Sequence, residues 1–324
     1  MKGPALIIVI MTLFMVFMLM HESAGIALLN FKKAEQQARS LSHHYEAESQ
    51  LSLLKWKLMQ DISQNRNRSF GQIFEEEDID ERFRADGRIK EWELDNKIVS
   101  SQISDAIRGF NLQGSISSAR TSAFRKLLNL EDDSTVLFLE ELPKYTQNSD
   151  LNDLSVYEGF DLPRKSGMEY EEEIYWIPGS EDFANLTLFQ DIYSPESLKS
   201  LVRPFIPKDV RVSRALKSSF YAADLNEIAM RLNLTGEEIA ELGEARRLWL
   251  EEGIALQETV PELYTRAKSY FSFKESGVYS LKVMISDLDG LNTVSHEGII
   301  QLTSKGPRSA GKFKGIQFWS RTSF

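Results

Sequence analysis

Residues 5–20 read ALIIVIMTLFMVFMLM, a run without a charged residue, a glycine or a proline. In a helix that rises about 1.5 Å per residue, these residues cover roughly 24 Å, slightly less than a hydrocarbon core of about 30 Å. His21 and Glu22 interrupt the run, and apolar residues resume over 24–29. The stretch therefore predicts an N-terminal helix that enters a membrane.

Three kinds of N-terminal segment fit this run. A secretory signal peptide would be cut near the small residues 23–25. An uncleaved signal anchor is the second possibility. A pilin-type leader is the third, because a short basic stub over residues 1–3 precedes the apolar run. Basic residues lie on both sides of the run, so the positive-inside rule does not by itself orient the segment.

A helical pattern continues beyond the apolar run. Apolar residues recur at steps of three and four from residue 34 to residue 62, and no proline falls between Pro4 and Pro143. The pattern predicts one long helix with one apolar stripe, although two helices with a bend near Glu22 give the same spacing. The stripe consists of Ala34, Ala38, Leu41, Tyr45, Ala47, Leu51, Leu54, Leu58 and Ile62.

The rest of the chain alternates between strand and helix patterns. Strands are predicted over residues 88–94 and 97–103, with an Asp-Asn turn between them, and again over 277–285 and 297–303. The residues between these two pairs have mainly helical patterns. They include a helix that Asp224 can cap and a Thr-x-x-Glu capping box that begins at Thr235. This order predicts an α+β fold with a large, mainly helical insertion.

Charge and composition exclude several functions. With 38 basic and 48 acidic residues the net charge is −10, which disfavours nucleic-acid binding because that binding needs a basic surface. The absence of cysteine removes disulfides and thiolate chemistry. His21, His43 and His44 fall on the anchor or stalk and His296 near a hairpin, so we do not expect them to meet with a nucleophile. No catalytic motif is present, and we predict that the protein is not an enzyme.

Calcium is the one ligand that the residues suggest. Hard cations take six to eight oxygen ligands, and residues 150–173 supply many carboxylates in a loop-like stretch. A solvated acidic loop is the alternative for this region. Asp287, Asp289 and Asn292 form a second, weaker cluster, for which a plain hairpin turn is the alternative.

Several segments, in a fixed order, resemble one known family. The start of the chain resembles the family's leader, a basic residue and a glycine before Ala-Leu-Ile, with Ile8 where most pilins have a glutamate. Residues 103–112 (ISDAIRGFNL) resemble its strand, turn and Phe-Asn-Leu-Asn motif, with Gln113 replacing the second asparagine. The Asp-rich stretch over 150–161, residues 167–169, the helical pair over 224–249 and the strand over 278–283 follow in the family's order.

Over about residues 1–303 the chain thus resembles general secretion pathway protein K, the large minor pseudopilin of bacterial type II secretion systems. The resemblance implies a pilin-like antiparallel sheet behind the long helix, a single pass through the inner membrane and a body in the periplasm. It also implies a place at the tip of a pseudopilus, where the protein would help to initiate assembly and protein export. The implied partners are other minor pseudopilins, inner-membrane secretion components and, through the N-terminal helix, the lipid bilayer.

The resemblance also implies two kinds of site. The family's leader is cut after a glycine, which would be Gly3, so that Pro4 would become the first residue. Calcium sites occur in the family's insertion, and the matching candidates here are Asp150, Asp153, Asp161 and Glu169. The alternative function is a membrane-anchored extracytoplasmic scaffold or sensor domain.

The predicted organisation has six parts. These are a leader stub (1–3), a transmembrane helix (4–23), an amphipathic stalk helix (24–62), a pilin-like body (63–117 and 269–303), a helical insertion (118–268) and a flexible basic tail (304–324).

Overall fold

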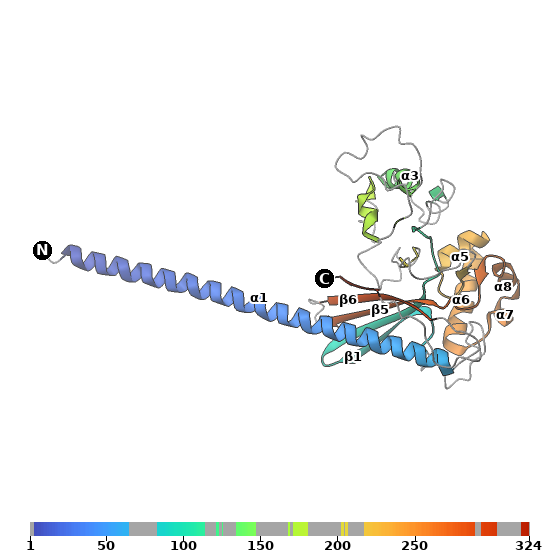
Figure 1. Cartoon of the computed structure of the whole chain (residues 1–324), viewed down its shortest axis with the longest axis horizontal. Coiled ribbons are helices and arrows are strands. Elements are labelled where there is room, and N and C mark those ends of the chain that lie inside the picture. The colour runs from blue at the N-terminus through green and yellow to red at the C-terminus, as the bar shows by residue number, and fades with distance from the viewer. Residues whose placement is uncertain are drawn as a thin grey trace.

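The fold is α+β and combines a long N-terminal helix, an antiparallel sheet and further helices (Figure 1). It is seen in a computed structural model. This structure describes residues 3–64, 83–113, 121, 122, 125, 134–146, 168, 171–180, 202, 203, 205, 206, 217–288, 293–302 and 319–323.

Helix α1 (Gly3–Gln64) is continuous over 62 residues, so it has a length of about 93 Å. The alternative of two helices with a bend near Glu22 is therefore wrong. In Figure 1 the first half of α1 projects away from the rest of the protein, and only the second half runs along the sheet. The predicted transmembrane and stalk segments are thus two parts of one rigid element.

The main sheet has five strands in the order β1-β2-β5-β6-β7, and every neighbouring pair is antiparallel. Asp95 and Asn96 form the predicted tight turn between β1 and β2, with φ angles of 48° and 64°. Pairing of β2 with β5, from Lys97 opposite Asp287 onwards, joins segments far apart in the sequence. The strands are β1 (Asp86–Leu94), β2 (Lys97–Asp105), β5 (Val278–Asp287), β6 (Thr293–Gln301) and β7 (Trp319–Ser323).

The last strand corrects one prediction. Residues 304–324 were expected to form a flexible tail throughout, but Trp319–Ser323 form β7, which pairs with β6 from Ile299 to Ser295. The backbone N–H and C=O groups along the outer side of β6 need partners, and this short segment supplies them. The composition of the tail did not reveal this because strand pairing depends on a distant edge.

The core lies between α1 and one face of the sheet. Leu51, Leu54 and Leu58 on the helix pack with alternate residues of β2, β5 and β6, since successive side chains of a strand point to opposite faces. On the sheet, the buried partners in this core are Val99, Ile103, Tyr279, Leu281, Val283, Ile285, Val294 and Ile300.

Helices of the predicted insertion pack at the C-terminal end of α1 (Figure 1). Asp224 caps α5 by accepting a hydrogen bond from the N–H of Asn226, and Thr235 and Glu238 form the predicted capping box of α6. The short strand β3 (Ser218–Ser219) pairs in parallel with β4 (Phe271–Ser272) and so connects this unit to the residues before β5. The helices are α5 (Leu225–Leu232), α6 (Gly236–Glu252), α7 (Leu256–Thr259) and α8 (Pro261–Ala267).

A second helical pair lies apart from these helices in Figure 1 and consists of α3 (Ser134–Thr146) and the 3-10 helix η3 (Glu171–Trp176). Gly179, with φ of 80°, allows the two to approach closely. A Cβ atom at this position would lie 2.8 Å from the backbone N of Phe138.

Packing of α1 on the sheet predicts different effects for two neighbouring leucines. Leu51 has 0% of its surface exposed, whereas Leu53 is 41% exposed. Leu51→Ala should lower the free energy of unfolding by about 2–5 kcal/mol because it leaves a cavity, and Leu53→Ala by less than about 1 kcal/mol. Chemical denaturation of the full chain in detergent, followed by tryptophan fluorescence, measures both. Equal effects would contradict the packing described here.

Candidate functional site

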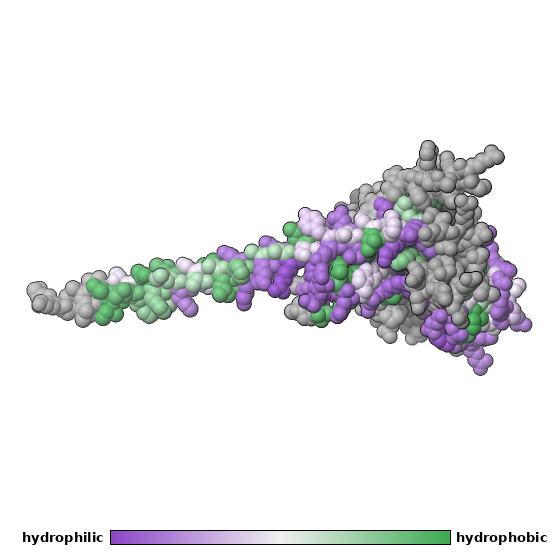
Figure 2. Space-filling view, turned by 90° about the horizontal axis from the view of Figure 1, so that it is seen from below, coloured by the Kyte–Doolittle hydropathy of each residue, from purple (hydrophilic) through white to green (hydrophobic). Residues whose placement is uncertain are grey.

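The first half of α1 exposes large apolar side chains all around its circumference. Phe14, Phe17 and Phe31 are 63–70% exposed, and the space-filling view shows this apolar arm projecting from a more polar body (Figure 2). Soluble proteins rarely expose apolar patches of this size unless they contact a membrane or another protein. Among the described residues, α1 is the one helix that is both long enough and apolar enough to cross a membrane, judged by length and composition.

The second half of α1 has two apolar faces, which corrects the prediction of a single stripe. Tyr45 and Ala47 are only two residues apart, and a step of two turns a helix by about 200°. The earlier part of the predicted stripe therefore points away from the sheet, and the part from Ala47 onwards points toward it. Leu41, Tyr45 and Trp56 are 53–62% exposed. We call this outward row the outer stripe; it consists of Phe31, Ala34, Ala38, Leu41, Tyr45, Leu53 and Trp56.

Polar contacts attach α1 to three successive strands at the point where the helix leaves the body. Glu46 accepts hydrogen bonds from Lys97 Nζ of β2, which lies 2.7 Å from each carboxylate oxygen. His43 Nε2 lies 3.1 Å from Asp287 Oδ1 at the end of β5. His44 Nδ1 lies 3.0 Å from Nε2 of His296 on β6. We call these three contacts the polar seam.

The contact between the histidines of the polar seam joins distant parts of the chain. His43 and His44 are separated from His296 by about 250 residues, and only the register of β6 against β5 places His296 on the face that α1 covers. Burial lowers the pKa of His296, and the neighbouring His44 lowers it further, while Glu48 opposes both effects. No signal in the sequence reveals this contact.

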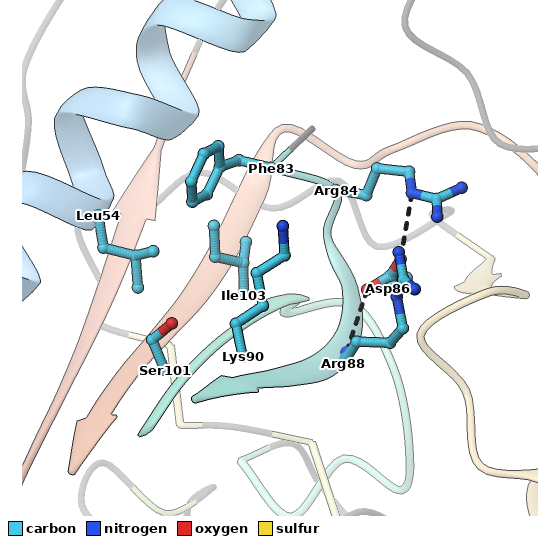
Figure 3. Close-up of a pocket in the computed structure, with 8 residues that line it drawn as sticks. All are labelled: Leu54, Phe83, Arg84, Asp86, Arg88, Lys90, Ser101 and Ile103. Carbon is cyan, nitrogen blue, oxygen red and sulfur yellow. Dashed lines mark hydrogen bonds and ion pairs between the residues drawn. The ribbon is translucent and has the colours of Figure 1, made fainter. Parts of the chain in front are cut away.

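The pocket drawn in Figure 3 lies near the other end of the packed segment of α1. Arg84 Nε and Arg88 Nε each lie 3.4 Å from Asp86 Oδ2, and Leu54 of α1 borders the same space. Its volume of about 10 Å³ holds roughly one water molecule. The pocket is a small gap between Leu54 of α1 and the ion pairs around Asp86, and it is too small for an organic ligand.

The segment that carries the strand-and-turn resemblance connects the sheet to the insertion. Gly109, with φ of 67°, donates its N–H to Glu227 Oε2 of α5 at 2.9 Å. Gln113 pairs with the backbone of Ile206 in both directions, each hydrogen bond being 2.7 Å long. Phe110 forms an isolated parallel bridge with Val202. The motif thus holds three distant parts of the chain together.

Asp105 lies at the start of this segment and is fully buried. Its carboxylate accepts hydrogen bonds from the N–H of Ile107 at 2.8 Å and from the N–H and hydroxyl of Ser276, both at 2.7 Å. Burial raises the pKa of Asp105 to about 6, and the hydrogen bonds from Ser276 and Ile107 oppose that rise. Asp105 therefore joins the end of β2 to the residues that precede β5.

The structure places only some of the predicted site residues. Gly3 and Pro4 lie in the first turn of α1. The four calcium candidates, Asp150, Asp153, Asp161 and Glu169, lie outside the described residues, so calcium binding stays a prediction.

Of the second calcium cluster, Asp287 contacts His43, and Asp289 and Asn292 lie outside the described residues. The part of the chain that the structure describes contains no group of three or more His, Cys, Asp or Glu residues arranged to hold a metal.

The structure defines a protein with an apolar N-terminal helix that is exposed over its first half and packs on an antiparallel sheet over its second half. No protein-family model matches the chain, and no curated protein matches it. Among solved structures, one similar chain belongs to the crystal structure of the GspK-GspI-GspJ complex from the enterotoxigenic Escherichia coli type 2 secretion system. The TM-score is 0.48 and the identity 14%, over 91% of this chain and 99% of that one.

Replacing Asp105 tests its role as a buried joint. Asp105→Ala should lower the free energy of unfolding by about 2–4 kcal/mol, because it leaves the N–H groups of Ile107 and Ser276 without their acceptor. Ser276→Ala removes the hydroxyl, which hydrogen-bonds Asp105 and Val278, but keeps the N–H bond to Asp105, and should cost about 1–2 kcal/mol. Thermal unfolding of the full chain in detergent, followed by near-UV circular dichroism, compares the two variants. A smaller loss for Asp105→Ala than for Ser276→Ala would contradict this role.

Proposed function

We propose that the protein is a minor pseudopilin of a bacterial type II secretion system, anchored in the inner membrane with its body in the periplasm. The observation that supports this most is α1 itself. An exposed apolar helix runs without a break into a helix packed on an antiparallel sheet, as the resemblance of the sequence implied. The role is mechanical and not enzymatic: the helix positions a folded body for assembly with other subunits.

The anchor and the assembly surface lie on the same helix. In the membrane, the apolar arm is in contact with lipid, and its exposed side chains stabilise insertion. On leaving the membrane, such a helix needs other apolar helices around it. The outer stripe adds apolar residues along the body, at Tyr45 and, after the exposed polar residues 48, 49 and 52, again at Leu53 and Trp56. It is suited to packing against the corresponding helices of other minor pseudopilins.

A place at the tip of the pseudopilus is the finer part of the proposal. Most pilins carry a glutamate five residues after the leader, where it pairs with the amino terminus of a neighbouring subunit. This chain has Ile8 there, so it lacks the group for that pair. A subunit that cannot pair in this direction suits the terminal position, from which it would help to initiate assembly and protein export.

Loss of the outer stripe should abolish partner binding without unfolding the body. The experiment is co-purification of the full chain from membranes that contain the pilin-like proteins encoded beside it. The double variant Tyr45→Ser/Trp56→Ser should retain about a tenth or less of the bound partner, because buried aromatic residues dominate such interfaces. Tyr270→Ser, which alters an aromatic side chain that is 53% exposed outside α1, is the matched control.

The control should bind partners as the unaltered chain does. If the unaltered chain binds none of its neighbouring pilin-like proteins, the proposed function fails. If the double variant binds them normally, the outer stripe is the wrong surface.

Cleavage of a pilin-type leader predicts a specific mature N-terminus. If a pilin-type leader is present, protein extracted from native membranes should begin at Pro4, and Gly3→Leu should preserve Met1. Intact-protein mass spectrometry distinguishes these two forms directly. A product that begins near Gly25 would instead identify a secretory signal peptide and would remove the anchor from the mature protein.

A further inference from the structure

We propose that the polar seam is a pH-sensitive latch, which holds α1 against the sheet near neutral pH and releases it around residues 43–46 in acid. The latch is an intramolecular property of this chain. Its consequence, a change in how the anchor is held relative to the body, rests on the function proposed above.

The facing nitrogens of His44 and His296 can share one hydrogen. Their facing nitrogens are 3.0 Å apart, which is a hydrogen-bond distance when one nitrogen carries hydrogen and the other offers a lone pair. The other ring nitrogen of His296, Nδ1, is buried and has no hydrogen-bond partner among the described residues. A neutral pair therefore makes one hydrogen bond. If His296 Nε2 donates this bond, protonating His296 adds an N–H at Nδ1, where the described residues offer no acceptor; if His296 Nε2 accepts it, protonation takes up the lone pair that accepts the bond.

Acid turns this attraction into repulsion. When both imidazoles are protonated, two N–H groups face each other and two positive charges lie within a few ångströms, so the hydrogen bond is lost. Because its pKa is lowered in the closed state, His296 binds a proton more readily once the helix is released. The closed state is favoured above the ordinary histidine pKa of about 6.5 and loses that advantage as the pH falls below it.

The neighbouring charged groups determine how large the effect is. His43 beside Asp287 acts in the opposite direction, since protonated His43 gains an ion pair. Glu48 is an acidic neighbour that offsets part of the charge on His296. Glu46 of α1 already pairs with Lys97 of β2, at 2.7 Å.

Other charges near β6 lie on the opposite face of the sheet. Lys282 and Glu297 face each other across β5 and β6, next to the pair of Val283 and His296. Because side chains alternate between the two faces of a sheet along each strand, Lys282 and Glu297 lie on the face opposite to His296. On β7 the residue opposite His296 is Thr322, which does not titrate. Among the described residues, the His44–His296 pair is therefore the part of the polar seam that acid weakens.

The apolar core confines the release to the N-terminal end of the part of α1 that packs on the sheet. From Ala47 onwards, the buried residues Leu51, Leu54 and Leu58 hold α1 on the sheet at any pH. Before His43, Leu41 belongs to the outer stripe and is 53% exposed. The polar seam is thus the last attachment before the projecting arm, so its release changes the exit of the arm and leaves the body folded.

The experiment measures a distance within the full chain in lipid nanodiscs. The sequence contains no cysteine, so Ser42→Cys and Thr293→Cys, both at exposed positions, supply the only two thiols for spin labels. Pulsed electron paramagnetic resonance between pH 7.5 and pH 5.0 should show a second, longer distance that grows in acid. The ratio of open to closed molecules should rise by up to about tenfold per pH unit for each additional proton bound.

Single substitutions show which histidines cause this response to pH. His44→Gln and His296→Gln should each abolish the growth of the longer distance, and His43→Gln should increase it by removing the opposing ion pair. His21→Gln is the matched control on the projecting arm and should behave as the unaltered chain.

An unchanged distance between pH 7.5 and 5.0, or an equal response in His44→Gln, would overturn the latch. Neither result depends on a partner, so failure here is distinct from failure of the proposed function.

Discussion

One helix has to serve two environments, and the rest of the structure depends on how it does so. Packing of Leu51, Leu54 and Leu58 against the sheet fixes the direction of α1 and the face that remains free. Because the helix is continuous, the position of its apolar arm follows from this packing. Burial of three leucine side chains, each worth about 1.5–3 kcal/mol, therefore determines the direction of the apolar arm and the face of α1 that stays exposed beside the sheet.

The sequence predicted the local elements of this fold well. The Asp95-Asn96 turn, the Asp224 cap and the capping box from Thr235 to Glu238 are confirmed because each is a contact between residues at most three positions apart. The α+β class is confirmed for the same reason, since strand and helix patterns are local.

The prediction of a single apolar stripe on α1 was wrong because one step in the pattern differs from the others. Steps of three or four residues keep a helix on one face, but the step of two between Tyr45 and Ala47 reverses it, and the count of apolar residues alone hides that change. The turn of about 200° at this step is visible in the sequence once it is sought. The His44–His296 contact is different, because it requires the register of β6 and the position of α1 together, and neither is a local property. The same holds for β7, whose pairing depends on a strand edge formed elsewhere.

The polar seam and the outer stripe meet at neighbouring residues of α1. The rings of His44 and Tyr45 are 5.9 Å apart in an edge-on arrangement, so the residue that senses the pH contacts one that faces the proposed partner. His44 is half-buried beside Tyr45, so a helix packed over Tyr45 would remove water from its exposed part, and loss of water disfavours the charged form of a histidine. Linkage then requires reciprocity: if a partner makes protonation of the pair harder, protonation must weaken binding of that partner by the same factor. On these two proposals, the anchor, the assembly surface and the latch would be energetically coupled through two adjacent residues of a single helix.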